Sequence, residues 1–447
     1  MGYSAMTEIQ AQTLPFIIDG KDVIAQAKTG SGKTAAFGLG LLNKLDVKRF
    51  RIQALVICPT RELANQVADE IRKLARAVHN IKVLTLCGAA PIGPQIGSLE
   101  HGAHIIVGTP GRLSDHLRKK TLDLSHVETL VLDEADRMLD MGFYEQISDI
   151  IEEVPDARQT LLFSATYPDD DKSKHGIKAI TQRFLHEAEF VKIEQVGQHV
   201  NIEQHFFEVE GKAARFKALE TLLVNESPES SIVFCHTKRD CQSLCDQLNE
   251  VGFSASALHG DLEQRDRHKT LIKFSNRSVR ILVATDVAAR GLDIEKVDAV
   301  FIYHLSKDSD IHTHRVGRTG RADHKGKAFI LFEASESFKV RLIEEHLGIK
   351  VLPRVIPAMH RKRIPGSSSM ATIEILGGKK QKVRAGDILG ALTSKKNKYE
   401  LNGHDIGKIN IMEQISYVAV KKEIARDALN AILDGRMKGK QFRARLV

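Results

Sequence analysis

The chain has 447 residues, of which 42% are hydrophobic and 27% charged, and its formal net charge at pH 7 is +8. This length predicts two or three domains, and the absence of any run of about 18 apolar residues excludes a membrane-spanning helix of the usual kind. The first ten residues lack the basic and apolar regions of a secretory signal, so we expect a cytoplasmic protein that contacts no membrane.

A glycine-rich segment follows the first strand-like stretch. The residues "AKTGSGKT" (27–34) come after "KDVIAQ" and precede a helical pattern. Glycines allow backbone N–H groups to surround phosphate oxygens, and the N-terminus of the following helix adds partial positive charge. Lys33 is expected to reach the β- and γ-phosphates of a nucleotide, and Thr34 to bind Mg²⁺. The nucleotide-binding residues predicted in this segment are Thr29, Gly30, Ser31, Gly32, Lys33 and Thr34.

Apolar runs alternate with helical patterns along most of the chain. Because these runs are apolar throughout, they are typical of parallel strands covered on both faces, and the alternation predicts βαβ units, twice over. The fold class expected is α/β, with two parallel-sheet lobes at 1–195 and 205–352. The runs lie at 54–60, 104–110, 129–136, 160–166, 231–237, 280–286, 299–304 and 327–332.

One of these runs ends in carboxylates, in the stretch "ETLVLDEADRML" (128–139). Like charges repel, so a cation is expected beside them. A solvated acidic turn would not explain the buried strand that leads into it. With a nucleotide and Mg²⁺ nearby, Asp133 would hold the metal, largely through its waters. Glu134 would then be the base that positions the attacking water.

Seven segments in a fixed order resemble the DEAD-box RNA helicase family. The resemblance covers roughly residues 1–352 and implies two RecA-like lobes, an ATPase stimulated by RNA, and the use of ATP and Mg²⁺. The segments are "AKTGSGKT" (27–34), "PTRELA" (59–64), "DEAD" (133–136), "TPGR" (109–112), "SAT" (164–166), "ARGLDI" (289–294) and "HRVGRTGR" (314–321).

The resemblance assigns roles around the nucleotide. Gln10, preceded by Thr7, resembles the glutamine that reads the adenine edge, and Asp293 resembles the residue that contacts the ribose. Arg318 and Arg321 resemble the arginine fingers, which act with Lys33, Asp133 and Glu134 in catalysis. Because these arginines lie on the second lobe, hydrolysis should be slow until a bound strand favours closure of the lobes.

Further roles concern RNA and its coupling to hydrolysis. Ser164 and Thr166 resemble the coupling element, and His314 resembles the residue that partners Asp136. Hydroxyls, glycine amides and arginines suit contacts to phosphate and 2′-OH groups, which carry no sequence information. The positions at which the family touches RNA backbone are Thr60, Arg61, Gly88, Thr109, Arg112, Arg267 and Thr285.

The N-terminal segment departs from the family pattern. The family carries an aromatic residue upstream of the adenine-reading glutamine, and Tyr3 lies too near Gln10 to be that residue. We therefore expect this chain to bind ATP more weakly than a longer form that supplies the aromatic ring.

The C-terminal segment 371–447 carries the whole excess of positive charge, with 16 Lys and Arg against 8 Asp and Glu. After a linker at 353–370, its pattern reads β-α-β-β-α-β and predicts an RNA-recognition-motif fold. RNA-recognition motifs usually carry aromatic residues on their strands, on which RNA bases stack. In this chain the aromatic position of the first strand is occupied by Glu374, and only Tyr417 remains on the sheet face for stacking. We expect binding through basic residues and RNA shape, with Lys379, Lys380, Lys382, Arg384 and Tyr417 as contacts.

A DEAD-box body followed by this tail resembles a bacterial branch of the family. That resemblance implies that the tail docks on a hairpin of large-subunit ribosomal RNA and directs local unwinding of short duplexes during ribosome assembly. No obligate protein partner is implied.

Other readings stay open. The protein could be a nucleotide-gated RNA clamp or annealing chaperone with weak unwinding, or a motor that acts on DNA. Cys241 and Cys245 could share a metal at their helical spacing, but no second ligand pair follows. A basic face that is merely solvated would also account for the charge of the tail.

Overall fold

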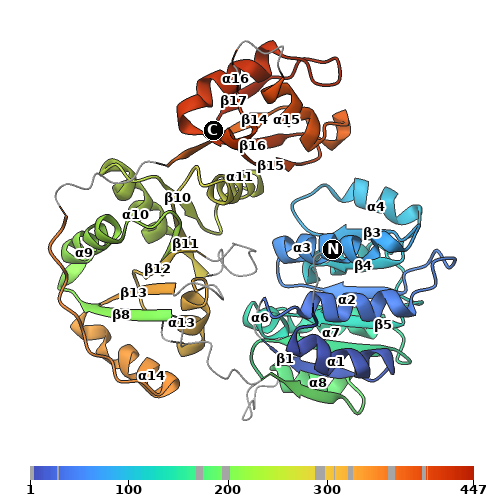
Figure 1. Ribbon diagram of the computed structural model, residues 1–447. Coiled ribbons are helices and arrows are strands. Elements are labelled where there is room, and N and C mark those ends of the chain that lie inside the picture. The colour runs from blue at the N-terminus through green and yellow to red at the C-terminus, as the bar shows by residue number, and fades with distance from the viewer. Residues whose placement is uncertain are drawn as a thin grey trace. The chain divides into compact units, whose positions relative to one another are not determined.

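The structure is a computed structural model that describes residues 5–27, 30–167, 175–193, 202–286, 297–306, 308–320, 326–360, 368–394, 399 and 401–447. The chain divides into two compact units, residues 1–196 with 291–293, and the remainder (Figure 1). No helix among the described residues is both long and apolar enough to cross a membrane.

The first unit contains a seven-stranded, wholly parallel sheet in the order β3-β4-β2-β5-β6-β1-β7. Its strands are β1 (Val23–Gln26), β2 (Ala54–Ile57), β3 (Val83–Leu86), β4 (Ile105–Gly108), β5 (Thr129–Asp133), β6 (Gln159–Ser164) and β7 (Glu189–Lys192). Its α-helices are α1 (Glu8–Ile18), α2 (Lys33–Lys44), α3 (Arg61–Leu74), α4 (Ile92–Glu100), α5 (Pro110–Arg118), α6 (Ala135–Asp140), α7 (Tyr144–Glu152) and α8 (Ile177–Phe184), with a 3₁₀ turn η1 (Ala75–Ala77).

Both faces of this sheet are covered. On one face, α1, α2 and α3 contribute Ile9, Phe37 and Ile71 to a core with alternate strand residues. On the other face, α5 to α8 contribute residues such as Leu113 and Ile147 to a second core. The central strands β2 and β5 are buried along their whole length. Burial on both faces explains why these strands are apolar throughout, as expected from the sequence.

The second unit contains a six-stranded parallel sheet in the order β10-β11-β9-β12-β13-β8. Its strands are β8 (Ile202–Glu208), β9 (Ser231–Cys235), β10 (Ala255–Leu258), β11 (Ile281–Thr285), β12 (Ala299–Ile302) and β13 (Gly326–Phe332). The helices are α9 (Gly211–Glu226), α10 (Lys238–Glu250), α11 (Gln264–Ser275), α13 (Ser309–Val316) and α14 (Ser337–Leu347), with a 3₁₀ turn η3 (Ala334–Glu336). The hydrophobic core on one face of this sheet is built largely from α9 and α10.

The same unit ends in a four-stranded antiparallel sheet in the order β15-β16-β14-β17. Its elements are β14 (Met370–Ile375), η4 (Lys379–Gln381), α15 (Ala385–Thr393), η5 (Gly403–Asp405), β15 (Ile406–Ile411), β16 (Ser416–Lys421), η6 (Lys422–Ile424), α16 (Ala425–Asp434) and β17 (Ala444–Leu446). The β-α-β-β-α-β order and the two parallel-sheet lobes confirm the predicted fold class.

The sequence pattern missed four strands, three of which are short. β3, β7, β8 and β10 were not among the expected runs, although each pairs with a neighbour in its sheet. β3, β7 and β10 have only four residues each. β7 also exposes two of its residues, so its sequence lacks a continuous apolar run. Such strands are specified by pairing with a neighbour rather than by their own pattern.

His304, just after β12, should make the folding stability of the second lobe depend on pH. Burial first, and then the nearby Arg215 charge, lower the pKa of His304 from its ordinary value near 6.5 to about 4. The unfolded chain therefore binds more protons than the folded chain between these values, so stability is lost as the pH falls through this window. We expect His304→Asn to flatten the fall in calorimetric unfolding temperature between about pH 6.5 and 4.

The asparagine can keep an acceptor for the backbone N–H of His236, which lies 3.3 Å from His304 Nδ1. His346→Asn, at an exposed position on α14, is the control and should leave the pH dependence unchanged. A His304→Asn curve parallel to that of the parent protein would contradict the assignment.

Candidate nucleotide and RNA site

The glycine-rich segment lies between β1 and α2, as expected. Gly30 and Gly32 have positive φ angles of 84° and 96°, which side chains with a Cβ rarely adopt. Gly32 caps α2, so the first N–H groups of that helix point toward the segment. Lys33 is buried, and its Nζ donates to the backbone O of Ala27 at 2.9 Å. This arrangement can bind an anion at the start of α2. Thr29 lies outside the described residues.

Gln10 and Thr7 lie against this segment. Gln10 Nε2 donates to the backbone O of Gly32 at 3.1 Å, and Gln10 Oε1 accepts from the backbone N–H of Thr7 at 2.9 Å. A Cβ added at Gly32 would lie 2.5 Å from Gln10 Nε2. The predicted adenine-reading pair and the predicted phosphate segment are therefore in direct contact, although about 20 residues separate them in the sequence.

Asp133 ends β5 with its carboxylate buried. Its Oδ1 finds no hydrogen-bond partner among the residues that the structure describes. Burial raises the pKa of Asp133 to about 6, the Lys33 charge opposes this rise, and the Glu134 charge adds to it. A buried carboxylate oxygen that lacks a partner in the described part of the chain, and on which the Lys33 charge acts, fits a Mg²⁺ ion bound with a nucleotide. Among the described residues, no three His, Cys, Asp or Glu side chains gather to hold a metal by themselves, so nucleotide and water would supply the other ligands.

Glu134 has an unusual backbone conformation, with φ 54° and ψ 52°, at the point where β5 turns into α6. Its carboxylate is buried and accepts from Arg137 Nη1 at 2.5 Å. Arg137 was not predicted from the sequence as a site residue. Its position three residues after Glu134, at the spacing that brings helical side chains together, was the available signal.

Asp136 joins the DEAD segment to the SAT segment within the first unit. Its Oδ2 accepts from the backbone N–H groups of Ala165 and Thr166 and from Thr166 Oγ1, at 3.0–3.2 Å. Ser164 Oγ donates to the backbone O of Thr166 at 2.7 Å, which closes the turn after β6. A movement of the SAT turn therefore acts directly on Asp136, three residues from Asp133.

Predicted RNA-contact residues of the first unit follow β2, β3 and β4. Thr60 caps α3, and its Oγ1 accepts from the backbone N–H of Leu63 at 3.3 Å. Arg61 lies over Gly88, since a Cβ added there would be 3.3 Å from its guanidinium. Thr109 caps α5, and Arg112 donates to Gln95 Oε1 and to the backbone O of Ala90, both at 3.0 Å.

The strand order places these groups in sequence along one edge of the sheet. Carboxyl ends of parallel strands meet at the same edge, where ligands bind in open α/β sheets. The predicted RNA contacts follow β3, β4 and β2, the DEAD and SAT segments follow β5 and β6, and the phosphate segment follows β1. The carboxylates thus lie between the predicted RNA surface and the predicted phosphate site.

In the second unit, Arg267 lies on α11, and Thr285 is buried at the carboxyl end of β11. His314 lies on α13, and Arg318 follows that helix, with its backbone O accepting from Val297 N–H at 3.0 Å. Asp293 and Arg321 lie outside the described residues.

In the C-terminal sheet, Lys379, Lys380, Lys382 and Arg384 form an exposed basic segment before α15. Tyr417 does not offer an open ring face on which an RNA base could stack, because the residue is only 4% exposed. Its hydroxyl donates to Glu374 Oε2 at 3.3 Å, and Arg445 donates to Glu374 Oε1 at 2.6 and 2.9 Å. Burial raises the pKa of Tyr417 to about 12, and the Glu374 charge contributes.

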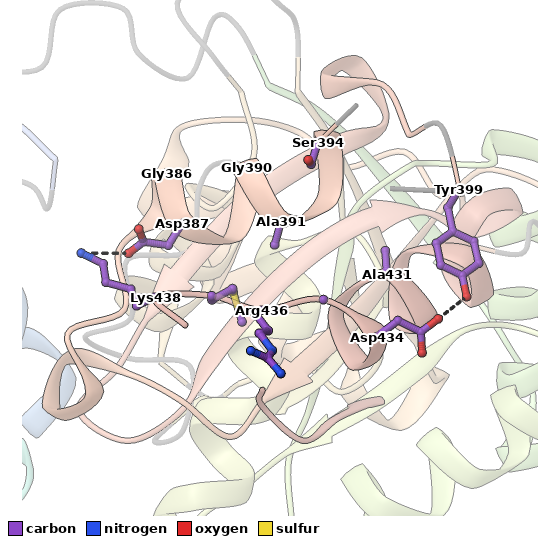
Figure 2. A pocket seen from close by; sticks show the side chains of 12 residues that line it. Gly386, Asp387, Gly390, Ala391, Ser394, Tyr399, Ala431, Asp434, Arg436 and Lys438 are labelled. Atoms are coloured by element: carbon purple, nitrogen blue, oxygen red, sulfur yellow. Dashed lines mark hydrogen bonds and ion pairs between the residues drawn. The ribbon is translucent and has the colours of Figure 1, made fainter. Parts of the chain in front are cut away.

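A pocket of about 660 Å³ lies between α15 and α16, and sequence reasoning did not identify it. Figure 2 shows its mixed lining, with Lys438 paired to Asp387 on one side and the Tyr399 hydroxyl donating to Asp434 on the other. Arg436 also lines it. The signal in the sequence was weak, because these residues come from segments about 50 residues apart.

Comparisons with known proteins agree with this geometry. Family models match at residues 7–174 (DEAD/DEAH box helicase), 214–323 (helicase conserved C-terminal domain) and 372–446 (DbpA RNA binding domain). The chain is 51% identical to the ATP-dependent RNA helicase DbpA of Escherichia coli, over 100% of this chain and 95% of that protein.

More distant relatives cover the two lobes. The ATP-dependent RNA helicase CshA of Listeria monocytogenes is 45% identical over 80% of this chain and 67% of its own length. The structure of Saccharomyces cerevisiae Dbp5 bound to RNA and ADP BeF3 has a TM-score of 0.70 at 30% identity, and covers 79% of this chain and 90% of that chain. The matched segments, the parallel sheets and the identity over the whole chain lead to one assignment: the protein belongs to the DEAD-box family of ATP-dependent RNA helicases, among the relatives of DbpA.

Proposed function

We propose that this RNA helicase locally unwinds or remodels short RNA duplexes, and that its C-terminal domain directs it to a hairpin of large-subunit ribosomal RNA during ribosome assembly. The observation that supports the catalytic part is the order of groups along the first sheet. The predicted RNA-contact residues, the DEAD and SAT segments and the phosphate segment follow adjacent strands, and hydrogen bonds from the SAT turn to Asp136 join two of these groups directly.

In the proposed reaction, the oxygen of a water molecule bonds to the γ-phosphorus of ATP while the water proton passes to Glu134. The bond from the γ-phosphorus to the β–γ bridging oxygen breaks, and its electron pair leaves with ADP. Lys33 neutralises phosphate charge. Asp133 and Thr34 would hold Mg²⁺, which would supply further positive charge to the phosphates. Gln10 and Thr7 read adenine, and Asp293 contacts the ribose.

We assign Arg318 and Arg321 to the charge that develops on the transferred phosphoryl group, a role that contributes roughly 10³–10⁵ in rate. Because these arginines belong to the second lobe, RNA that favours closure of the lobes stimulates hydrolysis. His314 and Asp136 would link the lobes in that closed state. RNA backbone is held by Thr60, Arg61, Gly88, Thr109, Arg112, Arg267 and Thr285.

The targeting part is tested by ATPase measurements on the exposed lysines of the tail. Replacing Lys379, Lys380 and Lys382 together with serine is expected to raise the concentration of a large-subunit ribosomal RNA fragment needed for half-maximal stimulation by about tenfold or more. The salt dependence of stimulation should also become shallower, since fewer counterions are released on binding. The maximal rate at saturating RNA should stay the same.

The matched control replaces Lys48, Lys73 and Lys217, which are also exposed, with serine and should leave RNA stimulation unchanged. Unrelated RNA supplies a second comparison, with and without residues 371–447. If ribosomal and unrelated RNA stimulate the full chain equally, the targeting proposal is wrong while the helicase assignment stands.

A nucleotide-gated RNA clamp, or an annealing chaperone with weak unwinding, is the alternative. A helicase needs ATP turnover for its function, whereas a clamp needs only ATP binding. A hydrolysis-deficient variant that keeps its function in cells would therefore favour the clamp.

A further inference from the structure

A buried ion pair joins Glu134 to Arg137 in the first unit. The Glu134 and Arg137 side chains are 3% and 5% exposed, and Arg137 Nη1 lies 2.5 Å from Glu134 Oε2. Surface pairs contribute little to stability, but a buried carboxylate needs a compensating charge and hydrogen bonds. The pair directly follows Asp133 at the carboxyl end of β5, where the proposed base lies, and this position suggests a role in the reaction.

We propose that Arg137 is a positioning residue for ATP hydrolysis, which orients the Glu134 carboxylate and compensates its buried charge so that it can receive the proton of the attacking water. The inference rests on the proposed role of Glu134 as base. In this role Arg137 acts through Glu134 and not directly on the nucleotide or the water.

The backbone supports this role. Glu134 adopts a left-handed conformation, which non-glycine residues hold only where their surroundings impose it and which is common at functional sites. Both the backbone and the side chain of Arg137 are held by hydrogen bonds. Its backbone N–H donates to Asp136 Oδ1 at 2.9 Å and to the backbone O of Glu134 at 3.1 Å, while its guanidinium reaches Glu134 Oε2. The arginine thus holds the turn and the carboxylate together.

Charge gives the second reason. Asp133 and Glu134 are adjacent, buried and alike in charge. A guanidinium forms a directed contact with one carboxylate oxygen, and so sets both its charge balance and its orientation.

Arg137→Met keeps much of the side-chain volume and removes the charge. We expect kcat of the full chain with saturating RNA to fall about 10- to 100-fold, because small misplacements of a catalytic group cost about this much. The KM for ATP and the RNA affinity measured with a non-hydrolysable ATP analogue should stay within about twofold, since Arg137 contacts neither ligand. Arg137→Lys, which keeps the charge, should recover part of the loss.

The deciding measurement is a double-mutant cycle with Glu134→Gln. If Arg137 acts through Glu134, adding Arg137→Met to Glu134→Gln should change kcat by less than about twofold, so the two effects are not additive. Full additivity would overturn the proposal. If Glu134→Gln alone leaves kcat intact, the base assignment fails instead, so the two failures are distinguishable.

Arg158→Met is the matched control for loss of a buried arginine in the same unit. The Arg158 side chain is 3% exposed and donates to the backbone O of Pro155 and Phe184, away from the phosphate segment. It should lower the unfolding temperature without lowering kcat at temperatures where the protein is folded. If Arg158→Met and Arg137→Met lost kcat equally, Arg137 would have only a structural role and the proposal would be wrong.

Discussion

Replacing Glu134 with glutamine is expected to lower the RNA-stimulated kcat for ATP hydrolysis by about 10²–10⁴-fold. Glutamine keeps the size and one oxygen of the side chain but cannot accept the water proton. Because the Asp133 oxygen and the phosphate segment are unchanged, the affinity for ATP should stay within about a few-fold. Steady-state ATPase assays with saturating RNA, combined with nucleotide titration, measure both quantities.

Glu128→Gln is the control for this change. Glu128 lies just before the other end of β5, is half exposed and pairs with Arg49 on the surface, so its loss should leave turnover unchanged. Retention of full turnover by Glu134→Gln would overturn its assignment as the base. If that variant lost turnover yet kept its function in cells, the clamp reading would gain support.

Replacing Gly32 with alanine is expected to raise the KM for ATP by about 10- to 100-fold. The left-handed backbone at φ 96° costs a residue with a Cβ about 1–2 kcal/mol. The new Cβ would also lie 2.5 Å from Gln10 Nε2 and 2.8 Å from Thr7 Oγ1. The variant can relieve this overlap by moving Gln10 and Thr7, which are the predicted adenine-reading pair, or by moving the turn that binds phosphate.

Gly97→Ala on α4 is the matched control. An added Cβ at Gly97 meets nothing within 4 Å, and its φ angle is not positive. Since alanine favours a helix by about 1 kcal/mol over glycine, this variant should be as stable as the parent protein or more stable, with unchanged KM. If Gly32→Ala bound ATP as tightly as the parent protein, the tight approach of Gln10 to the phosphate segment would have no part in nucleotide binding.

The local pattern of the chain was sufficient for the architecture. Residues 54–57 and 129–133 are apolar and buried on both sides, so they predict parallel strands without reference to any distant contact. The phosphate segment was predictable for a similar reason, since its chemistry depends on glycines and a helix start that are adjacent in the sequence. Short strands such as β7 escaped prediction, because pairing with β1 specifies them.

The C-terminal sheet shows where a pattern is insufficient. The sequence correctly indicated Tyr417 as an aromatic residue on a strand, next to the unusual Glu374. It contained no sign that the hydroxyl of the tyrosine and the guanidinium of Arg445 would meet on that carboxylate, which happens because β16 and β17 flank β14. Whether Tyr417 contacts RNA stays a prediction.

What the sequence determined by itself was therefore the two-lobe architecture with its C-terminal domain, the phosphate segment and the family to which the chain belongs, because each depends on residues that are close along the chain or on motifs in a fixed order. Tertiary structure alone decided which groups touch: Gln10 against Gly32, Asp136 against the SAT turn, and Arg137 against Glu134 rather than toward solvent. These contacts depend on strand order and on burial, and a buried charge is oriented by the partners that the fold brings within a few ångströms of it.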